Sequence, residues 1–88
     1  MITRTHAFSS RTIVDVIHYI DELLNSLEVR PILNYRLIEY HLVDSEKQPF
    51  MLIRVMEGRL EYSKSYTDEQ SDAKNQLFNK IESGLLKI

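Results

Sequence analysis

The amino-acid sequence predicts an α+β fold with the chain order α-β-β-β-α, in which both helices pack on one face of a three-stranded antiparallel meander. Three observations support this prediction. Apolar residues recur with helical spacing near both ends of the chain. Strand-like runs occupy the middle. Between two of these runs, Glu57-Gly58 predicts a tight hairpin, because glycine tolerates a positive φ angle.

The first helix is predicted over residues 10–27. Its apolar positions recur at steps of four and three, which places them on one face: Ile13, Ile17, Ile20, Leu24 and Leu27. A hydroxyl side chain is expected to cap the start, with three candidates: Ser9, Ser10 and Thr12. Pro31 disfavours helical backbone before it, so the helix is expected to end by about Glu28.

The second helix is predicted to follow a capping box at residues 67–70, where a Thr hydroxyl is followed three positions later by a Gln amide. Its apolar positions again recur on one face: Ala73, Leu77, Phe78, Ile81 and Leu85. Gly84 is expected to cap the end of this helix in the left-handed conformation.

Three strands are predicted between the helices, over about residues 33–43, 50–56 and 59–65. Residues 1–8 alternate weakly and are expected to form a flexible tail or a short edge strand. A two-residue turn at Glu57-Gly58 places Arg54 opposite Glu61, and pairing Leu42 with Met51 places Arg54 opposite Glu39 as well.

This register separates the sheet into two faces. One is the expected core face and holds Ile38, Tyr40, Leu42, Met51, Ile53, Val55, Leu60 and Tyr62. On the other face, Glu39, Arg54 and Glu61 form a charged row across three strands. Surface ion pairs contribute under about 1 kcal/mol each, so the row specifies the register more than it stabilises the fold.

The composition indicates one domain, residues 1–88. The absence of cysteine excludes disulfides and thiolate metal sites. The net charge of −2 does not favour nonspecific binding to nucleic acid. The N-terminus lacks the apolar region of a secretory signal, and the longest apolar run, residues 50–53, is far too short to span a membrane. We therefore expect a cytoplasmic protein with no membrane partner.

No catalytic signature is present. The sequence has no Gly-x-Ser-x-Gly elbow and no glycine-rich phosphate loop. His18 with Glu22, and Glu39 with His41, each offer two metal ligands, whereas zinc sites normally need three or four. We expect no enzymatic activity, no cofactor, no metal and no small-molecule substrate.

The predicted α-β-β-β-α order resembles that of double-stranded-RNA-binding domains. In that family a lysine-rich stretch and an Ala-Lys pair open the second helix and grip phosphates. Ala73-Lys74 matches the Ala-Lys pair, whereas the preceding residues 67–72 are acidic where the family is basic. The resemblance implies a nucleic-acid-binding module as the alternative function.

The leading prediction is a small interaction or regulatory protein that binds a protein partner, or a second copy of itself, through the sheet face opposite the core. One form of such a protein is a phage-type inhibitor of host machinery, whose acidic residues occupy a basic groove on the target. Exposed apolar area around a charged row is typical of interaction sites. The residues expected to contact the partner are Leu37, Glu39, His41, Phe50, Leu52, Arg54, Met56, Arg59 and Glu61.

Overall fold

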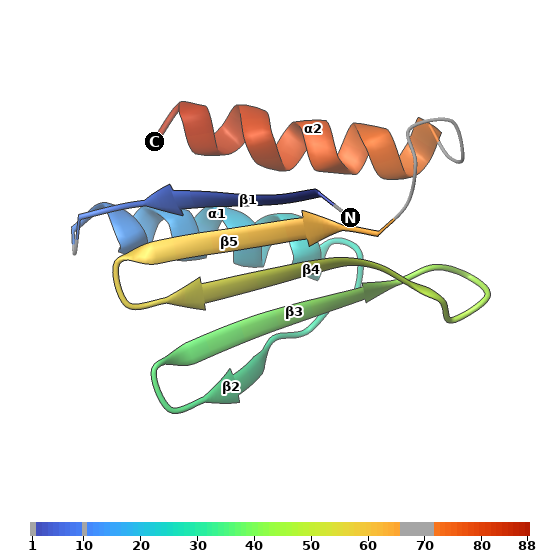
Figure 1. The fold of residues 1–88 in the computed structure, drawn as a ribbon, viewed down its shortest axis with the longest axis horizontal. Helices are drawn as coiled ribbons and strands as arrows, with labels where there is room; N and C mark the ends of the chain where they lie inside the picture. The colour runs from blue at the N-terminus through green and yellow to red at the C-terminus, as the bar shows by residue number, and fades with distance from the viewer. Residues whose placement is uncertain (1, 10, 66–71) are drawn as a thin grey trace.

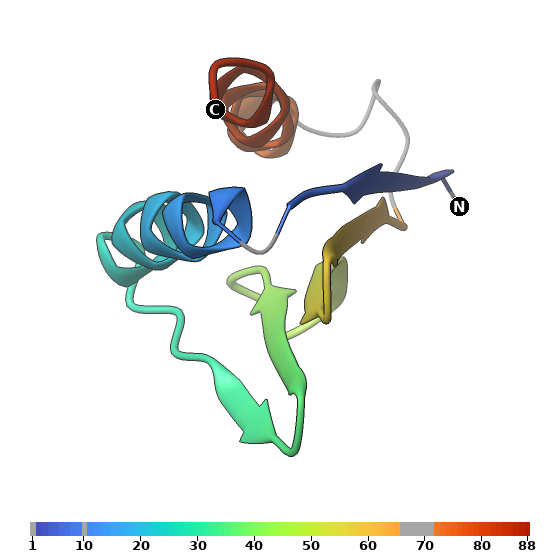
Figure 2. The ribbon, with the colours of Figure 1, turned by 90° about the vertical axis from the view of Figure 1, so that its left-hand side faces the viewer.

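The computed structural model describes residues 2–9, 11–65 and 72–88. These residues form β1 (Ile2–Ala7), α1 (Thr12–Asn25), β2 (Ile32–Asn34), β3 (Leu37–Val43), β4 (Pro49–Met56), β5 (Arg59–Lys64) and α2 (Asp72–Leu86). The strands form one antiparallel sheet in the order β1-β5-β4-β3-β2 (Figure 1). Both helices lie on the same side of this sheet (Figure 2). The predicted α+β class is therefore confirmed.

The core lies between the helices and the sheet. α1 contributes Val16, Ile20 and Leu24, and α2 contributes Phe78, Ile81 and Leu85. The sheet contributes the predicted core residues Tyr40, Leu42, Met51, Ile53, Val55, Leu60 and Tyr62, with Ile38 partly buried beside them. Burying apolar surface between the two helices and the sheet supplies the main stabilisation of a domain this small.

The predicted register of β3, β4 and β5 is confirmed. Gly58 adopts a φ of 73° in the β4–β5 turn, and Arg54 pairs with Glu61 across this hairpin. Arg54 also pairs with Glu39 of β3. Turn geometry and apolar alternation select the same pairing, which is why these strands were predictable residue by residue.

The sheet has five strands, so the predicted three-stranded meander is incomplete. The N-terminal segment forms β1, an edge strand paired with β5 from Ile2↔Lys64 to Ala7↔Arg59. Of the two alternatives for this segment, the edge strand is therefore confirmed for residues 2–7. A strand before α1 also separates this fold from the chain order of double-stranded-RNA-binding domains.

The first predicted strand, residues 33–43, is wrong as a single element. A two-residue turn at Tyr35-Arg36 divides it into β2 and β3, which pair with Asn34 opposite Leu37. Arg36 adopts a φ of 62° in this turn. Two-residue hairpin turns usually have glycine or asparagine at the position of positive φ. Arginine is uncommon in that conformation, and with no glycine here nothing in the sequence indicated the turn.

α1 covers most of the predicted range. Arg11, the residue directly before the helix, makes no side-chain capping hydrogen bond, but one of the three predicted hydroxyl groups does bond to the first turn. The Ser9 hydroxyl oxygen accepts a hydrogen bond from the Thr12 backbone N–H at 3.1 Å. Beyond the helix, the Val29 N–H donates to the Leu24 carbonyl and Glu28 adopts a φ of 62°, as in a Schellman-type ending. Leu27 falls in this ending and is 50% exposed, so its predicted place in the core is wrong.

Gly84 is not the C-terminal cap that the sequence predicted. α2 continues to Leu86, and Gly84 instead lies against the ring of Tyr19 on α1. A Cβ atom at this position would collide with that ring. Glycine avoids this collision and so allows the two helices to approach each other at this point. The predicted capping box at residues 67–70 lies outside the described residues.

Candidate functional site

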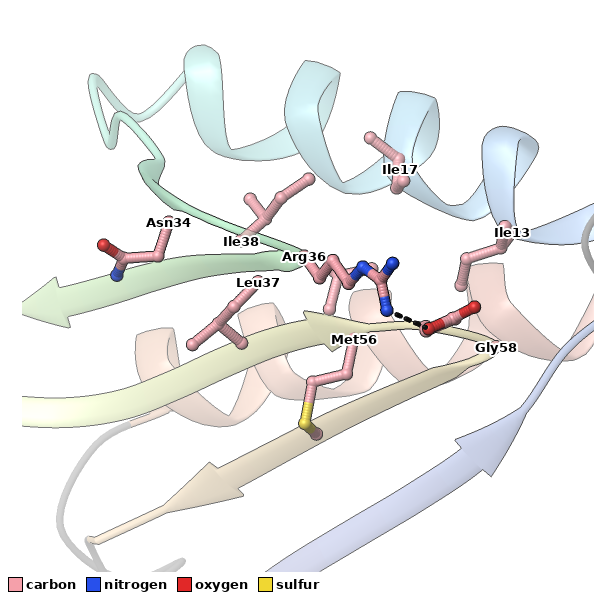
Figure 3. A pocket seen from close by; sticks show the side chains of 10 residues that line it. Ile13, Ile17, Asn34, Arg36, Leu37, Ile38, Met56 and Gly58 are labelled. Atoms are coloured by element: carbon pink, nitrogen blue, oxygen red, sulfur yellow. Dashed lines mark ion pairs between the residues drawn. The ribbon is translucent and has the colours of Figure 1, made fainter.

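The side of the sheet turned away from the helices is open within the described ranges, and we call it the outer face. β1 does not fold over it, because β1 lies beside β5 in the sheet. In Figure 3, Ile38 is directed towards α1, whereas Leu37 and Met56 point to the other side. Alternation along three strands places eight of the predicted contact residues on the outer face: Leu37, Glu39, His41, Leu52, Arg54, Met56, Arg59 and Glu61.

The charged row lies at the centre of the outer face. Arg54 Nε lies 3.5 Å from Glu39 Oε2, and an Arg54 terminal nitrogen lies 3.8 Å from Glu61 Oε1. The Arg54 side chain is 38% exposed, against 19% for Glu39 and 29% for Glu61. Arg54 Nε is itself buried and makes no hydrogen bond to the described residues. Both distances exceed the hydrogen-bond range, so Arg54 is held by loose ion pairs rather than by hydrogen bonds.

Apolar side chains flank the row. Leu37, Leu52 and Met56 are each half-buried on the outer face. An Arg59 terminal nitrogen lies 3.6 Å from the Met56 sulfur. The positive charges of Arg54 and Arg59 equal in number the negative charges of Glu39 and Glu61. These four residues therefore add no net charge to the apolar area of the outer face.

Phe50 was predicted on this face, and that placement is wrong. The β3–β4 register pairs Leu42 with Met51 but Val43 with Pro49, so it skips Phe50 in a bulge. Phe50 packs against the core, and the Lys74 ammonium lies 5.0 Å from the centre of its ring. A bulge shifts side chains to the opposite face, and no turn residue in the sequence signalled this one.

Asp44 organises the β3–β4 loop, a role that the sequence analysis missed. Its Oδ1 accepts hydrogen bonds from the backbone N–H groups of Glu46 and Gln48, each at 2.9 Å. Its Oδ2 lies 3.1 Å from Lys74 Nζ on α2. The Gln48 bond, with the Lys74 contact, lowers the pKa of Asp44. An aspartate directly after a strand is a recognisable turn signal, so this role of Asp44 was in principle predictable.

A polar cluster joins β1, β5 and α2 on the helix side of the sheet. The Tyr62 hydroxyl donates to Glu82 Oε1 at 3.1 Å, and Arg4 Nε lies 2.6 Å from the same oxygen. His6 stacks on the Tyr62 ring with 5.6 Å between centroids, and its Nε2 lies 3.3 Å from the hydroxyl oxygen. Burial, together with Glu82, raises the pKa of Tyr62, so this phenol stays neutral and serves as a structural donor.

Tyr40 has a matching role beneath α1. Its hydroxyl donates to Asp21 Oδ1 at 3.2 Å. Burial and the Asp21 carboxylate raise the pKa of Tyr40 to about 12. Both core tyrosines therefore bind a helix carboxylate at the edge of the core, which satisfies their hydroxyl groups.

A cavity of about 520 Å³ opens between the first half of α1 and the two hairpin turns (Figure 3). Ile13, Ile17 and Ile38 form apolar walls, and Arg36 lies 3.8 Å from Glu57 at the turns. This cavity does not bring together a nucleophile and a base of the kinds that hydrolytic sites use.

Across residues 2–9, 11–65 and 72–88, no group of three or more potential metal ligands is found. His18 lies exposed on α1, and His41 Nε2 lies 3.7 Å from Glu39 Oε2 on the outer face. In the same part of the chain, no helix has the length and apolar character that crossing a membrane requires.

These features define a small α+β domain with one sheet face covered by helices and one open face. In comparisons with known proteins, no protein-family model, no curated protein and no solved structure matched the chain. Any functional proposal therefore depends on the surfaces of this molecule.

Proposed function

We propose that this protein is a non-enzymatic interaction protein that binds a protein partner through its outer face. The observation that carries the proposal is the composition of that face. Half-buried Leu37, Leu52 and Met56 surround Arg54, which two carboxylates hold only loosely. Apolar area with a central arginine is typical of residues that dominate binding energy at protein interfaces.

The balance of charge on the outer face favours a protein over a nucleic acid. Nucleic-acid binding depends on Lys and Arg that neutralise phosphates. On the outer face, the two negative charges of Glu39 and Glu61 already offset the two positive charges of Arg54 and Arg59. Lys74, the residue that matches the RNA-binding pattern, lies 3.1 Å from Asp44 and over the Phe50 ring. A phosphate would have to displace that carboxylate.

Site-specific photo-cross-linking tests the proposal. A photoreactive amino acid replaces Leu52 on the outer face, and a control variant carries it in place of Val14, which is 52% exposed on α1. After irradiation in a native lysate, we expect one or a few defined protein adducts from position 52 that position 14 does not form. The double variant Leu52→Glu/Met56→Glu should remove the adducts formed by a photoreactive residue at position 41, which lies beside Leu52.

Circular dichroism should show the wild-type fold in each variant. Identical adducts from positions 52 and 14, or adducts from position 41 that persist in the double variant, would refute the outer face as the contact. Salt-sensitive binding of duplex RNA or DNA tighter than about 1 μM, measured by fluorescence anisotropy, would favour the nucleic-acid alternative instead.

A further inference from the structure

The strand β2 forms one end of the sheet and lies apart from both helices (Figure 2). Its far edge pairs with no other strand in the described part of the chain. The apolar side chains along it are unusually exposed: Ile32 is 49%, Leu33 71% and Tyr35 87% exposed. At the other end of the sheet, β1 carries the exposed polar residues Thr3 and Thr5 instead. The two edges therefore differ in chemistry.

The backbone of β2 offers hydrogen-bonding groups at this edge. In a hairpin with a two-residue loop, the residues that flank the loop exchange hydrogen bonds, and such pairs alternate along the ladder. Asn34 and Leu37 flank the loop, so the next pair, Leu33 with Ile38, is not hydrogen-bonded. The N–H and C=O of Leu33 therefore point away from β3, toward the open edge.

Positive charge flanks the apolar stretch. Arg30 precedes it, and Arg36 follows it in the β2–β3 turn, six positions later in the sequence. Arg30 is exposed and has no carboxylate within ion-pair distance among the described residues. Arg36 lies 3.8 Å from Glu57, with both side chains more than 60% exposed (Figure 3). Such a pair exchanges partners at little cost.

We propose that β2 receives an extended segment of a partner protein as a sixth strand of the sheet. The segment is about seven residues long, with apolar residues at its centre and a carboxylate near each end. Leu33 supplies the central main-chain hydrogen bonds, and Arg30 and Arg36 face the two carboxylates. Strand addition of this kind takes affinity from the backbone and specificity from side chains. This contact is separate from the outer face and does not depend on it.

Charge favours a foreign segment over a second copy of this chain. An antiparallel pair of β2 strands centred on Leu33 would place Arg30 of one copy opposite Arg36 of the other. Like charges directly opposite each other destabilise a strand pair. The chain as a whole carries a net charge of −2, so the attraction for an acidic segment is local to this edge.

A peptide-binding experiment tests the proposal. The probe is a labelled seven-residue peptide with glutamate at both ends and alternating valine and threonine between them. Its control has lysine at both ends. By fluorescence anisotropy, we expect wild-type protein to bind the glutamate peptide about tenfold more tightly than the lysine peptide. The variant Arg30→Glu/Arg36→Glu should reverse this preference.

Two further probes isolate the backbone contribution. Leu33→Pro removes the edge N–H while sparing the hydrogen bonds to β3, and it should weaken binding at least tenfold, whereas Leu33→Thr keeps the N–H and should retain binding. A glutamate peptide with N-methyl groups on its central residues should bind wild-type protein at least tenfold more weakly. This second probe leaves the protein unchanged, so it remains decisive even if Leu33→Pro perturbs the hairpin.

Three results would overturn the proposal: binding of neither peptide, equal binding of both, or unchanged affinity for the N-methylated peptide. Concentration-dependent dimerisation in sedimentation equilibrium that Leu33→Pro abolishes would identify a second copy as the occupant and refute the foreign segment. The outer-face variant Leu52→Glu/Met56→Glu should leave peptide binding unchanged, so failure of this proposal and failure of the proposed function are distinguishable.

Discussion

Substitution of Gly84 by alanine should destabilise this protein, although the same change normally stabilises a helix. Replacing a glycine inside a helix by alanine is worth about 1 kcal/mol in its favour. Gly84 lies inside α2, but a Cβ atom there would collide with the Tyr19 ring. The structure therefore predicts that the Tyr19 ring turns a normally stabilising substitution into a destabilising one.

The magnitude follows from what the Tyr19 ring would lose. Its hydroxyl donates to the Lys80 carbonyl at 2.6 Å, and displacing the ring forfeits about 1 kcal/mol for that bond. Overpacking of the half-buried ring costs about 1–3 kcal/mol more. After subtracting the gain of about 1 kcal/mol in helix propensity, we expect Gly84→Ala to lower the free energy of unfolding by about 1–3 kcal/mol. In a domain of this size, each kcal/mol corresponds to about 4–8 °C in Tm.

The assay is a double-mutant cycle in urea, followed by circular dichroism. Gly84→Ala is measured in the wild-type background and in a Tyr19→Ala background, where it should stabilise by about 1 kcal/mol. The coupling energy should then be about 2–4 kcal/mol. Tyr19→Phe serves as the control that removes only the hydrogen bond. If Gly84→Ala stabilises both backgrounds equally, the close approach of α1 and α2 at this point is wrong.

Three other substitutions or conditions test further features. Glu28→Gly relieves a φ of 62° at the end of α1 and should raise the free energy of unfolding by about 1 kcal/mol in urea denaturation, whereas Glu28→Ala should not. Arg54→Ala leaves Glu39 and Glu61 without their shared cation and should cost about 1 kcal/mol, most of which Glu39→Gln in the same chain should restore. The contribution of Tyr40 and Tyr62 to the free energy of unfolding should stay constant up to about pH 10 and decrease above it. Folding raises the pKa of Tyr40 to about 12 and also raises that of Tyr62, so the folded state holds protons that the unfolded state releases near pH 10. Absorbance at 295 nm should show these two phenols ionising only on unfolding, and Tyr40→Phe should reduce the steepness of the loss.

The parts of the fold that the sequence predicted are those where independent signals agreed. For β4 and β5, the Gly58 turn, the apolar alternation and the Arg54–Glu61 pair all required one register, and the structure has it. The helical stripes were equally clear, because Ile20 and Ile81 recur with their neighbours at helical spacing and are fully buried.

The features that the sequence did not predict depend on backbone conformations without a residue signal. Arg36 turns the chain at a positive φ that glycine or asparagine would have announced. The bulge at Phe50 moves one side chain to the helix side, and only the pairing of both strands reveals it. Gly84 was assigned to a helix end because its other use, the close approach of a second helix, depends on Tyr19, which lies far away in the sequence.

The outer face and the β2 edge would recognise partners by different physics, and this difference makes the two proposals separable. The outer face offers side chains, so its binding should respond to Leu52 and Arg54 and be indifferent to the backbone of β2. The edge offers the N–H and C=O of Leu33, so its binding should survive a change of the Leu33 side chain that keeps the N–H. The outer face and the β2 edge are adjacent, because Ile32 of β2 pairs directly with Glu39, a member of the charged row on the outer face. A partner strand beside β2 would thus extend the outer face by one strand, and one partner that used both surfaces would gain from their proximity without any new contact.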